Sequence, residues 1–135
     1  MDFALTKEQK ELKERVAEFS QREIAPRAEA LDRDGVIPTD LFHKLGDLGV
    51  LSIPFAEEWG GMGLGVMEAT LALEEVARAD QSLAVGAMVS IATGLTLARF
   101  GDRALAEKYL PDIVSGKRIC SIAGTEPQAG SDTAG

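Results

Sequence analysis

The residues best suited to hold a ligand are the last eleven, TEPQAGSDTAG (125–135). Thr125 and Ser131 offer hydroxyl groups, Pro127 fixes a turn, and Gly130 lets backbone amides approach an oxyanion such as a pyrophosphate. Such a segment can form a neutral, hydrogen-bonding cradle for a cofactor. Its composition is also that of an ordinary turn-rich loop, so the residues alone leave both interpretations open.

Side chains that could do acid–base or metal chemistry are sparse and isolated. Glu126 has no partner carboxylate or base beside it, and its position before a proline is typical of a turn. His43 has no nucleophile or metal ligand at helical spacing, so we expect it to be solvated and non-catalytic. Cys120 is the single cysteine. We expect its side chain to be half-buried in the core and to bind no metal. A single cysteine also fits a protein of a reducing compartment.

Composition indicates one globular domain of 135 residues that is 45% hydrophobic. Its net charge is −8, from 22 acidic and 14 basic residues. Because the basic residues do not cluster, we expect no nucleic-acid partner. The first residues, MDFALTKEQKELKERV, do not resemble a targeting peptide, which favours a cytoplasmic protein.

The chain that must position the terminal segment is mostly helical in pattern. Thr6 and Gln9 form a capping box that opens a helix over about 6–24, with Pro26 ending or kinking it. Residues 32–38 are expected to be a connecting turn. A second helix follows in TDLFHKLGDLG (39–49), where Gly49 is placed for the C-terminal cap.

A glycine-rich stretch, EEWGGMGLG (57–65), precedes the next predicted helix. Gly61, Gly63 and Gly65 match neither the dinucleotide fingerprint nor a P-loop, so a close-packed corner anchored by Trp59 is favoured over a phosphate site. In the following helix, one apolar face is predicted from Val66, Ala69, Leu73 and Val76.

The stretch from 81 to 98 carries no charge and is borderline in length for a membrane span. A helix that is apolar on all sides also suits the centre of a bundle, and we favour that interpretation. Gly86, Ser90 and Gly94 recur every four residues along it. They form either a helix-packing face or a groove for a slender apolar ligand.

A short helix that begins after Asp102 leads into KRICSIAG (117–124), which has the composition of a strand but no partner strand in the chain. The predicted fold class is therefore all-α, a helical bundle with a short C-terminal strand. We expect two units: a helical domain over residues 1–116, and the start of a β-domain over 117–135.

The segment IAGTEPQAGSD (122–132) resembles the flavin-binding signature of the acyl-CoA dehydrogenase family. Other stretches are similar to that family in the same order: LTKEQKELKERVAEFSQREIAPRA, PFAEEWGGMGLG, LEEVARAD and KYLPDIVSGK. The resemblance covers essentially the whole chain. Two positions depart from the family pattern: Ile122 stands where an aromatic residue is common, and Gly124 where a larger apolar residue is common.

This resemblance implies the N-terminal helical domain of a three-domain flavoenzyme, cut where the β-domain begins. The family reaction removes an α-proton of an acyl-CoA thioester with a Glu and passes a hydride from the β-carbon to the flavin. In most members that Glu lies in the C-terminal domain, so no catalytic residue is assigned here and the fragment is expected to be inactive.

Carried over by position, the resemblance assigns FAD contacts to the terminal segment and substrate contacts to Ser131, Ser90 and Gly94. Thr125 would bond the flavin ring and Ser131 would lie near the pyrophosphate or the CoA, while Ser90 and Gly94, with Gly86, would line the acyl tail. The predicted FAD-binding residues are Ile122, Ala123, Gly124, Thr125, Gly130 and Ser131.

The implied partners of the whole enzyme are an acyl-CoA substrate, electron-transferring flavoprotein and three further copies in a homotetramer. Two alternatives stay open. One is a fragment of an acyl-CoA oxidase or nitroalkane oxidase, and the other is a free-standing helical interaction module. For the fragment itself we expect self-association, either by strand pairing through residues 118–123 or through the small-residue face of the apolar helix.

Overall fold

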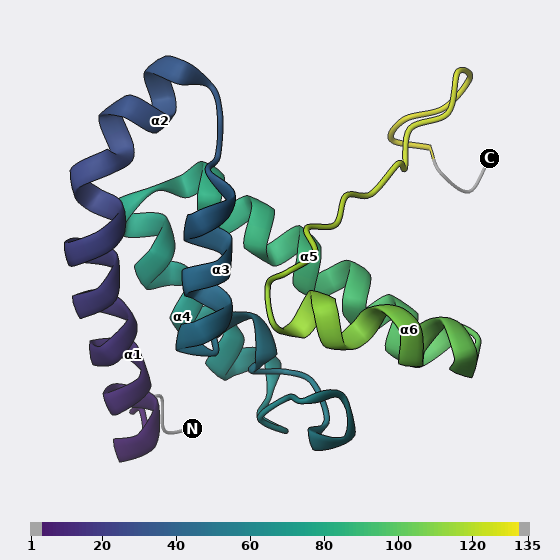
Figure 1. Ribbon diagram of the computed structural model, residues 1–135, viewed down its shortest axis with the longest axis horizontal. Helices are drawn as coiled ribbons and strands as arrows, with labels where there is room; N and C mark the ends of the chain where they lie inside the picture. Colours follow the sequence, from purple (N-terminus) through teal and green to yellow (C-terminus); the bar gives the residue numbers. More distant parts are fainter. Residues whose placement is uncertain (1–3, 133–135) are drawn as a thin grey trace.

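Helices stacked side by side in chain order make up the computed structural model, which describes residues 4–132. Helix α1 packs on α4, α4 on α5, and α5 on α6. The shorter helices α2 and α3 lie in the chain between α1 and α4 (Figure 1). The described residues form no β-ladder, and their one isolated bridge joins Glu126 to Ala129. The α-helices are α1 (Lys7–Phe19), α2 (Ala28–Asp34), α3 (Thr39–Leu48), α4 (Val66–Ala79), α5 (Gln81–Phe100) and α6 (Arg103–Val114).

The predicted start of the first helix is confirmed, and so is its predicted extent to about Ile24, where the helical geometry changes just before Pro26. Thr6 Oγ1 accepts the Gln9 amide at 3.2 Å and Gln9 Oε1 accepts the Thr6 amide at 3.0 Å, which completes the capping box. Beyond α1 the chain stays helical through a π turn (Ser20–Ile24) and a 3-10 turn (Ala25–Arg27) into α2. Pro26 is tolerated because it lies at the start of a new helical turn, where an amide donor is not required.

Two corners of the chain are tightly packed. Gly49 ends α3 in the left-handed conformation, at φ 88°, as predicted. In the glycine-rich stretch, a Cβ at Gly61 would overlap the backbone of Phe55, so the chain closes on itself there. Trp59 lies under the guanidinium of Arg103, 4.7 Å from the ring centre. The prediction of a close-packed corner is confirmed.

Helix α5 is buried along one face rather than on all sides. By length and composition it could cross a membrane, and one-third of its apolar window is buried within the bundle. Leu83, Ala87 and Ile91 enter the core between α4 and α6. Val85 and Met88, by contrast, are about half exposed, at 46% and 50%. The expectation of a helix covered all round is therefore corrected for the described chain.

After α6 the chain leaves the bundle. Asp102 caps α6, since its Oδ1 accepts the Ala104 amide at 2.8 Å. The residues that follow, drawn in yellow in Figure 1, run away from the helices. The strand predicted over 117–124 is not found as part of a ladder, because the described chain offers no second strand to pair with it.

Candidate functional site

The predicted cofactor-binding residues lie together on one projecting segment, which we name the signature loop (residues 121–132) (Figure 1). Every residue of it except Ala129 is exposed. A turn closes at its tip, where the Glu126 amide donates to the Ala129 carbonyl at 2.9 Å and the Ala129 amide donates to the Glu126 carbonyl at 3.3 Å. Glu126 is thus a turn residue in the described structure, as its position before proline predicts.

The backbone of the signature loop is open to a ligand. A Cβ at Gly124 would meet only Ile122, at 3.9 Å, and one at Gly130 would meet only Thr125, at 3.8 Å. Within the described chain, residues 121–125 make no hydrogen bonds. Free amides and carbonyls, together with the exposed hydroxyls of Thr125 and Ser131, form a neutral set of donors and acceptors of the kind that can hydrogen-bond a ring edge or an oxyanion.

The small-residue face of α5 is filled by this domain itself. The ring of Phe42 lies 3.3 Å from the Cβ position of Gly86, and the ring of Phe55 lies 2.7 Å from that of Gly94. Ser90 is 1% exposed and its hydroxyl accepts the Cys120 amide at 3.1 Å. The predicted acyl-tail wall at Ser90 and Gly94 is therefore corrected: these positions pack against α3, the Phe55 corner and the chain after α6.

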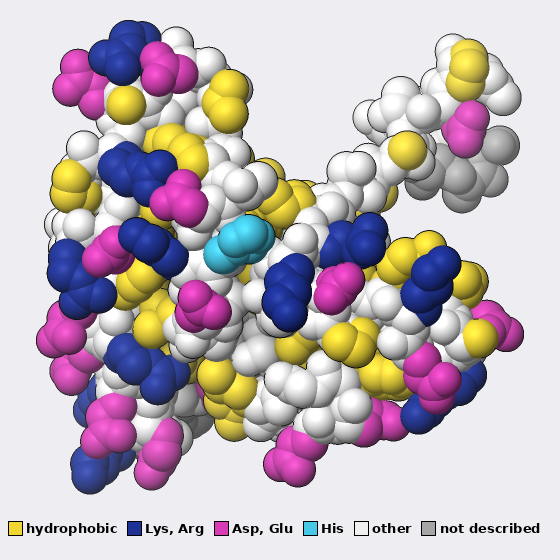
Figure 2. Space-filling view, viewed as in Figure 1, with side chains coloured by type: hydrophobic (Ala, Val, Ile, Leu, Met, Phe, Trp, Pro, Cys, Tyr) yellow, Lys and Arg dark blue, Asp and Glu magenta, His cyan; other side chains and the backbone are white. Residues whose placement is uncertain are grey.

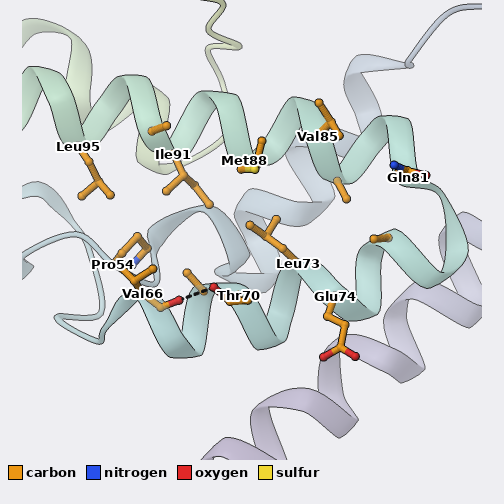
Figure 3. A pocket seen from close by; sticks show the side chains of 14 residues that line it. Pro54, Val66, Thr70, Leu73, Glu74, Gln81, Val85, Met88, Ile91 and Leu95 are labelled. Atoms are coloured by element: carbon orange, nitrogen blue, oxygen red, sulfur yellow. Dashed lines mark hydrogen bonds between the residues drawn. The ribbon is translucent and has the colours of Figure 1, made fainter.

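An apolar groove lies instead between α4 and α5, with a volume of about 580 Å³. Figure 3 shows Leu73 of α4 facing Ile91 and Met88 of α5 across it, while Leu95 lies opposite Pro54 and Val66. The groove is lined by Pro54, Val66, Ala69, Thr70, Leu73, Glu74, Ala77, Gln81, Ala84, Val85, Met88, Ile91, Ala92 and Leu95.

The few polar groups of this groove are at its edge or already bonded. Thr70 Oγ1 donates to the Val66 carbonyl at 2.8 Å. Glu74 points away toward α1 (Figure 3), where the Lys13 ammonium donates to it at 3.0 Å. This contact, with a second from Arg78, holds the pKa of Glu74 below its usual range. Among residues 4–132, no Lys or Arg lines the groove.

Sequence inspection did not identify this groove, although a signal was present. Val85, Met88, Ala92 and Leu95 follow one another at helical spacing on the face of α5 opposite its small residues. Residues 81–98 carry no charged side chain, so this apolar face has no charged face to contrast with in the sequence. It is recognised as one side of a groove only because α4 lies beside it in the structure.

The other predicted candidates lie outside any cluster of catalytic side chains. His43 is exposed on α3, as predicted, and is the cyan side chain of Figure 2. Cys120 is half-buried against the core, also as predicted, and its burial raises the pKa of its thiol. Residues 4–132 contain no group of three or more His, Cys, Asp or Glu side chains that could hold a metal ion.

A helical bundle that leads into an exposed, hydroxyl-bearing loop has the organisation implied for the first domain of a flavoenzyme. Residues 6–117 match the model of the family described as acyl-CoA dehydrogenase, N-terminal domain. The chain belongs to this family, which confirms the resemblance seen in its motifs.

Individual relatives agree with this assignment. The chain is 40% identical to the probable acyl-CoA dehydrogenase YngJ of Bacillus subtilis, over all of this chain and 36% of that protein. A glutaryl-coenzyme A dehydrogenase in complex with glutaryl-CoA superposes with a TM-score of 0.93 at 33% identity, covering 98% of this chain and 35% of the other. PigA with FAD and proline gives 0.90 at 31% identity, with 98% and 36% covered. The chain thus spans about a third of the length of these relatives.

Proposed function

We propose that this chain forms the N-terminal helical domain, and the start of the FAD-binding region, of an FAD-dependent dehydrogenase that introduces an α,β double bond into acyl-CoA thioesters. The observation that carries the proposal is the exposed signature loop, whose described residues 121–125 make no hydrogen bonds, directly after a domain of the acyl-CoA dehydrogenase family. A relative that holds FAD has the same fold over nearly all of this chain.

In this proposal the chain binds and orients the cofactor but supplies no base. Thr125 holds the flavin ring through its hydroxyl and backbone, and Ser131 contacts the pyrophosphate or the CoA. Flavin bound there supplies a hydride acceptor for the β-carbon of the substrate. Glu126 closes a turn through its own backbone, which gives no reason to assign proton abstraction to it. The α-proton is therefore removed by a residue outside these 135.

The acyl tail, we propose, lies along the groove between α4 and α5. An apolar groove of about 580 Å³ is within the size range of small-molecule sites. Because it is lined by no Lys or Arg, a carboxylate at the far end of the tail would lose its hydration without gaining a cationic partner. The substrate is accordingly an acyl-CoA with an apolar tail, in contrast to the glutaryl-CoA bound by one structural relative.

We further propose that electron-transferring flavoprotein accepts the electrons from the flavin, and that the whole enzyme is a homotetramer assembled through its other domains. Both follow from family resemblance. The 135-residue chain alone is expected to dehydrogenate no acyl-CoA and to bind FAD weakly or not at all, because one exposed loop gives few hydrogen bonds to set against the freedom lost on binding.

The test uses the product of the complete reading frame that encodes these residues. We expect a yellow protein that reduces a dye acceptor with butyryl-CoA or isovaleryl-CoA, and at least about tenfold more slowly with glutaryl-CoA, the cost of a poorly placed charge being a few kcal/mol. Hydrogen peroxide produced at the rate of turnover would instead support the oxidase alternative. A colourless product that retains no FAD would contradict the proposal.

A further inference from the structure

The signature loop is tied to the helical bundle by a buried hydrogen bond just before it begins. The amide of Cys120 donates to Oγ of Ser90, at 3.1 Å. Ser90 lies in the middle of α5 and is 1% exposed, while Cys120 packs half-buried against the core. An amide left without a partner at such a place would cost about 1–3 kcal/mol, so the bond strongly favours this path of the chain.

A second attachment precedes the first by two residues and is more exposed. The amide of Arg118 donates to the carbonyl of Asp112 at 3.0 Å, and its guanidinium lies 5.2 Å from the ring centre of Tyr109. The Arg118–Asp112 side-chain pair is 3.6 Å long and about half exposed, so it holds the segment weakly. Ser90 is therefore the last firm attachment before the loop.

Between this attachment and the loop tip the chain is unsupported. Residues 121–125 form no hydrogen bonds within the described chain. The position of Thr125 therefore depends on Cys120, the last residue before it that is held, and on the Ser90 hydroxyl that holds it. Five residues can span at most about 18 Å, and seven, counted from Arg118, about 25 Å. Loss of the Ser90 bond would enlarge the volume that Thr125 explores before it meets a ligand.

We propose that Ser90 is a positioning residue for the flavin: it acts through the amide of Cys120 to hold the signature loop where Thr125 can bind the ring. The inference rests on the proposed function. It replaces the acyl-tail contact predicted for Ser90, and it places the two tasks of α5 on different faces, with the apolar groove at Val85 and Met88 and the loop attachment at Ser90.

The first measurement tests the attachment without a flavin. In the 135-residue chain, Ser90→Ala is expected to speed amide exchange at Cys120 by about tenfold, the effect of losing one hydrogen bond. Ser20→Ala is the matched control, because Ser20 is a fully buried serine whose hydroxyl has no partner in the described structure. It removes a buried hydroxyl without touching the loop. Unchanged exchange at Cys120 in Ser90→Ala overturns the proposal.

The second measurement tests positioning in the protein from the complete reading frame. We expect Ser90→Ala to release FAD several-fold faster and to alter the visible circular dichroism of the bound flavin, while Ser20→Ala does neither. Equal FAD release and equal spectra in both variants would reduce Ser90 to a structural contact and overturn the proposal. A wild-type protein without FAD would contradict the proposed function itself, so the two failures are told apart by the wild type.

Discussion

Gly46 shows how a single residue can reverse a general rule. Replacing a glycine inside a helix with alanine stabilises the helix by about 1 kcal/mol in the absence of tertiary contacts. Here a Cβ at Gly46 of α3 would overlap the carbonyl of Ser115, at the end of α6. We expect Gly46→Ala to lower the free energy of unfolding by about 1–3 kcal/mol, the usual cost of overpacking, in thermal or urea denaturation.

The control for this prediction is Ala92→Gly, at an exposed position of α5 beside the groove, where the main loss is helix propensity. It should cost about 1 kcal/mol. If Gly46→Ala instead raised the melting temperature, α3 and α6 would have to be farther apart than the structure places them.

For single residues, the sequence predicts conformation and exposure correctly where neighbouring residues determine them. The left-handed cap at Gly49 and the exposure of His43 follow from neighbouring residues and are confirmed. The close approach at Gly46 depends on Ser115, which is distant in sequence, so no local pattern could predict it. The same is true of Ser90, whose small side chain suggested a ligand groove but whose hydroxyl accepts the amide of Cys120.

The ends of two helices are joined through one carboxylate. Glu68 caps α4 by accepting the Gly65 amide at 3.0 Å, and it also accepts the Gln9 side-chain amide of α1 at 2.9 Å. The donation by Gln9, followed by backbone amides, holds the pKa of Glu68 below its usual value of 4.5. A carboxyl whose pKa is lowered on folding stabilises the fold above its unfolded pKa and loses this contribution as the pH falls through its folded pKa.

We therefore expect Glu68→Gln to lower the melting temperature at pH 7, with the difference from wild type shrinking below about pH 4.5 as the wild-type carboxyl becomes protonated. Gln9→Ala, which removes the principal donor, should weaken the same pH dependence while keeping the carboxylate. Melting curves between pH 3 and 7 measure both. A difference that stays constant from pH 7 to pH 3 would show that the charge of Glu68 has no part in joining α1 to α4.

Helices are predicted well where the hydrophobic periodicity and the capping residues agree. Prediction is poor where an element depends on another segment for packing or strand pairing. Helices α3, α4, α5 and α6 lie where their patterns place them. The helical path past Pro26 agrees with the predicted kink rather than with a helix end, and a π turn (Ser20–Ile24) lies just before it. The strand over 117–124 needs a neighbour that the described chain does not contain, so β-propensity alone did not produce a ladder.

Considered as a whole, the molecule has several exposed apolar side chains, and two apolar surfaces among them bear on association. One is the groove between α4 and α5, with Met88 50% exposed. The other is the segment after α6, where Ile122 is 63% exposed and the backbone of 121–125 is unpaired. Exposed apolar surface and unpaired backbone both favour association. The small-residue face of α5, offered by the sequence as a third surface, is already filled by Phe42 and Phe55.

We expect the 135-residue chain to self-associate at tens of micromolar through its C-terminal segment, as two copies pair their backbones over residues 118–123. Pairing satisfies amides and carbonyls of both chains at once, whereas contact between two grooves buries apolar side chains alone. Ile122→Lys should weaken the dimer in sedimentation experiments by placing like charges near each other across the pair. Met88→Lys is the matched control, since it puts the same charge on the groove.

The two variants divide the possible results clearly. A dimer lost in Ile122→Lys and kept in Met88→Lys supports strand pairing. Amides of this segment that are unbonded in the monomer, such as those of Ile119 and Ser121, should then show slowed exchange in the wild type as the concentration rises. A dimer lost only in Met88→Lys would assign association to the groove between α4 and α5. A wild-type monomer at these concentrations would contradict the prediction. It would mean that one short segment, even with its backbone unpaired, buries too little surface to offset the freedom lost when two chains of net charge −8 combine.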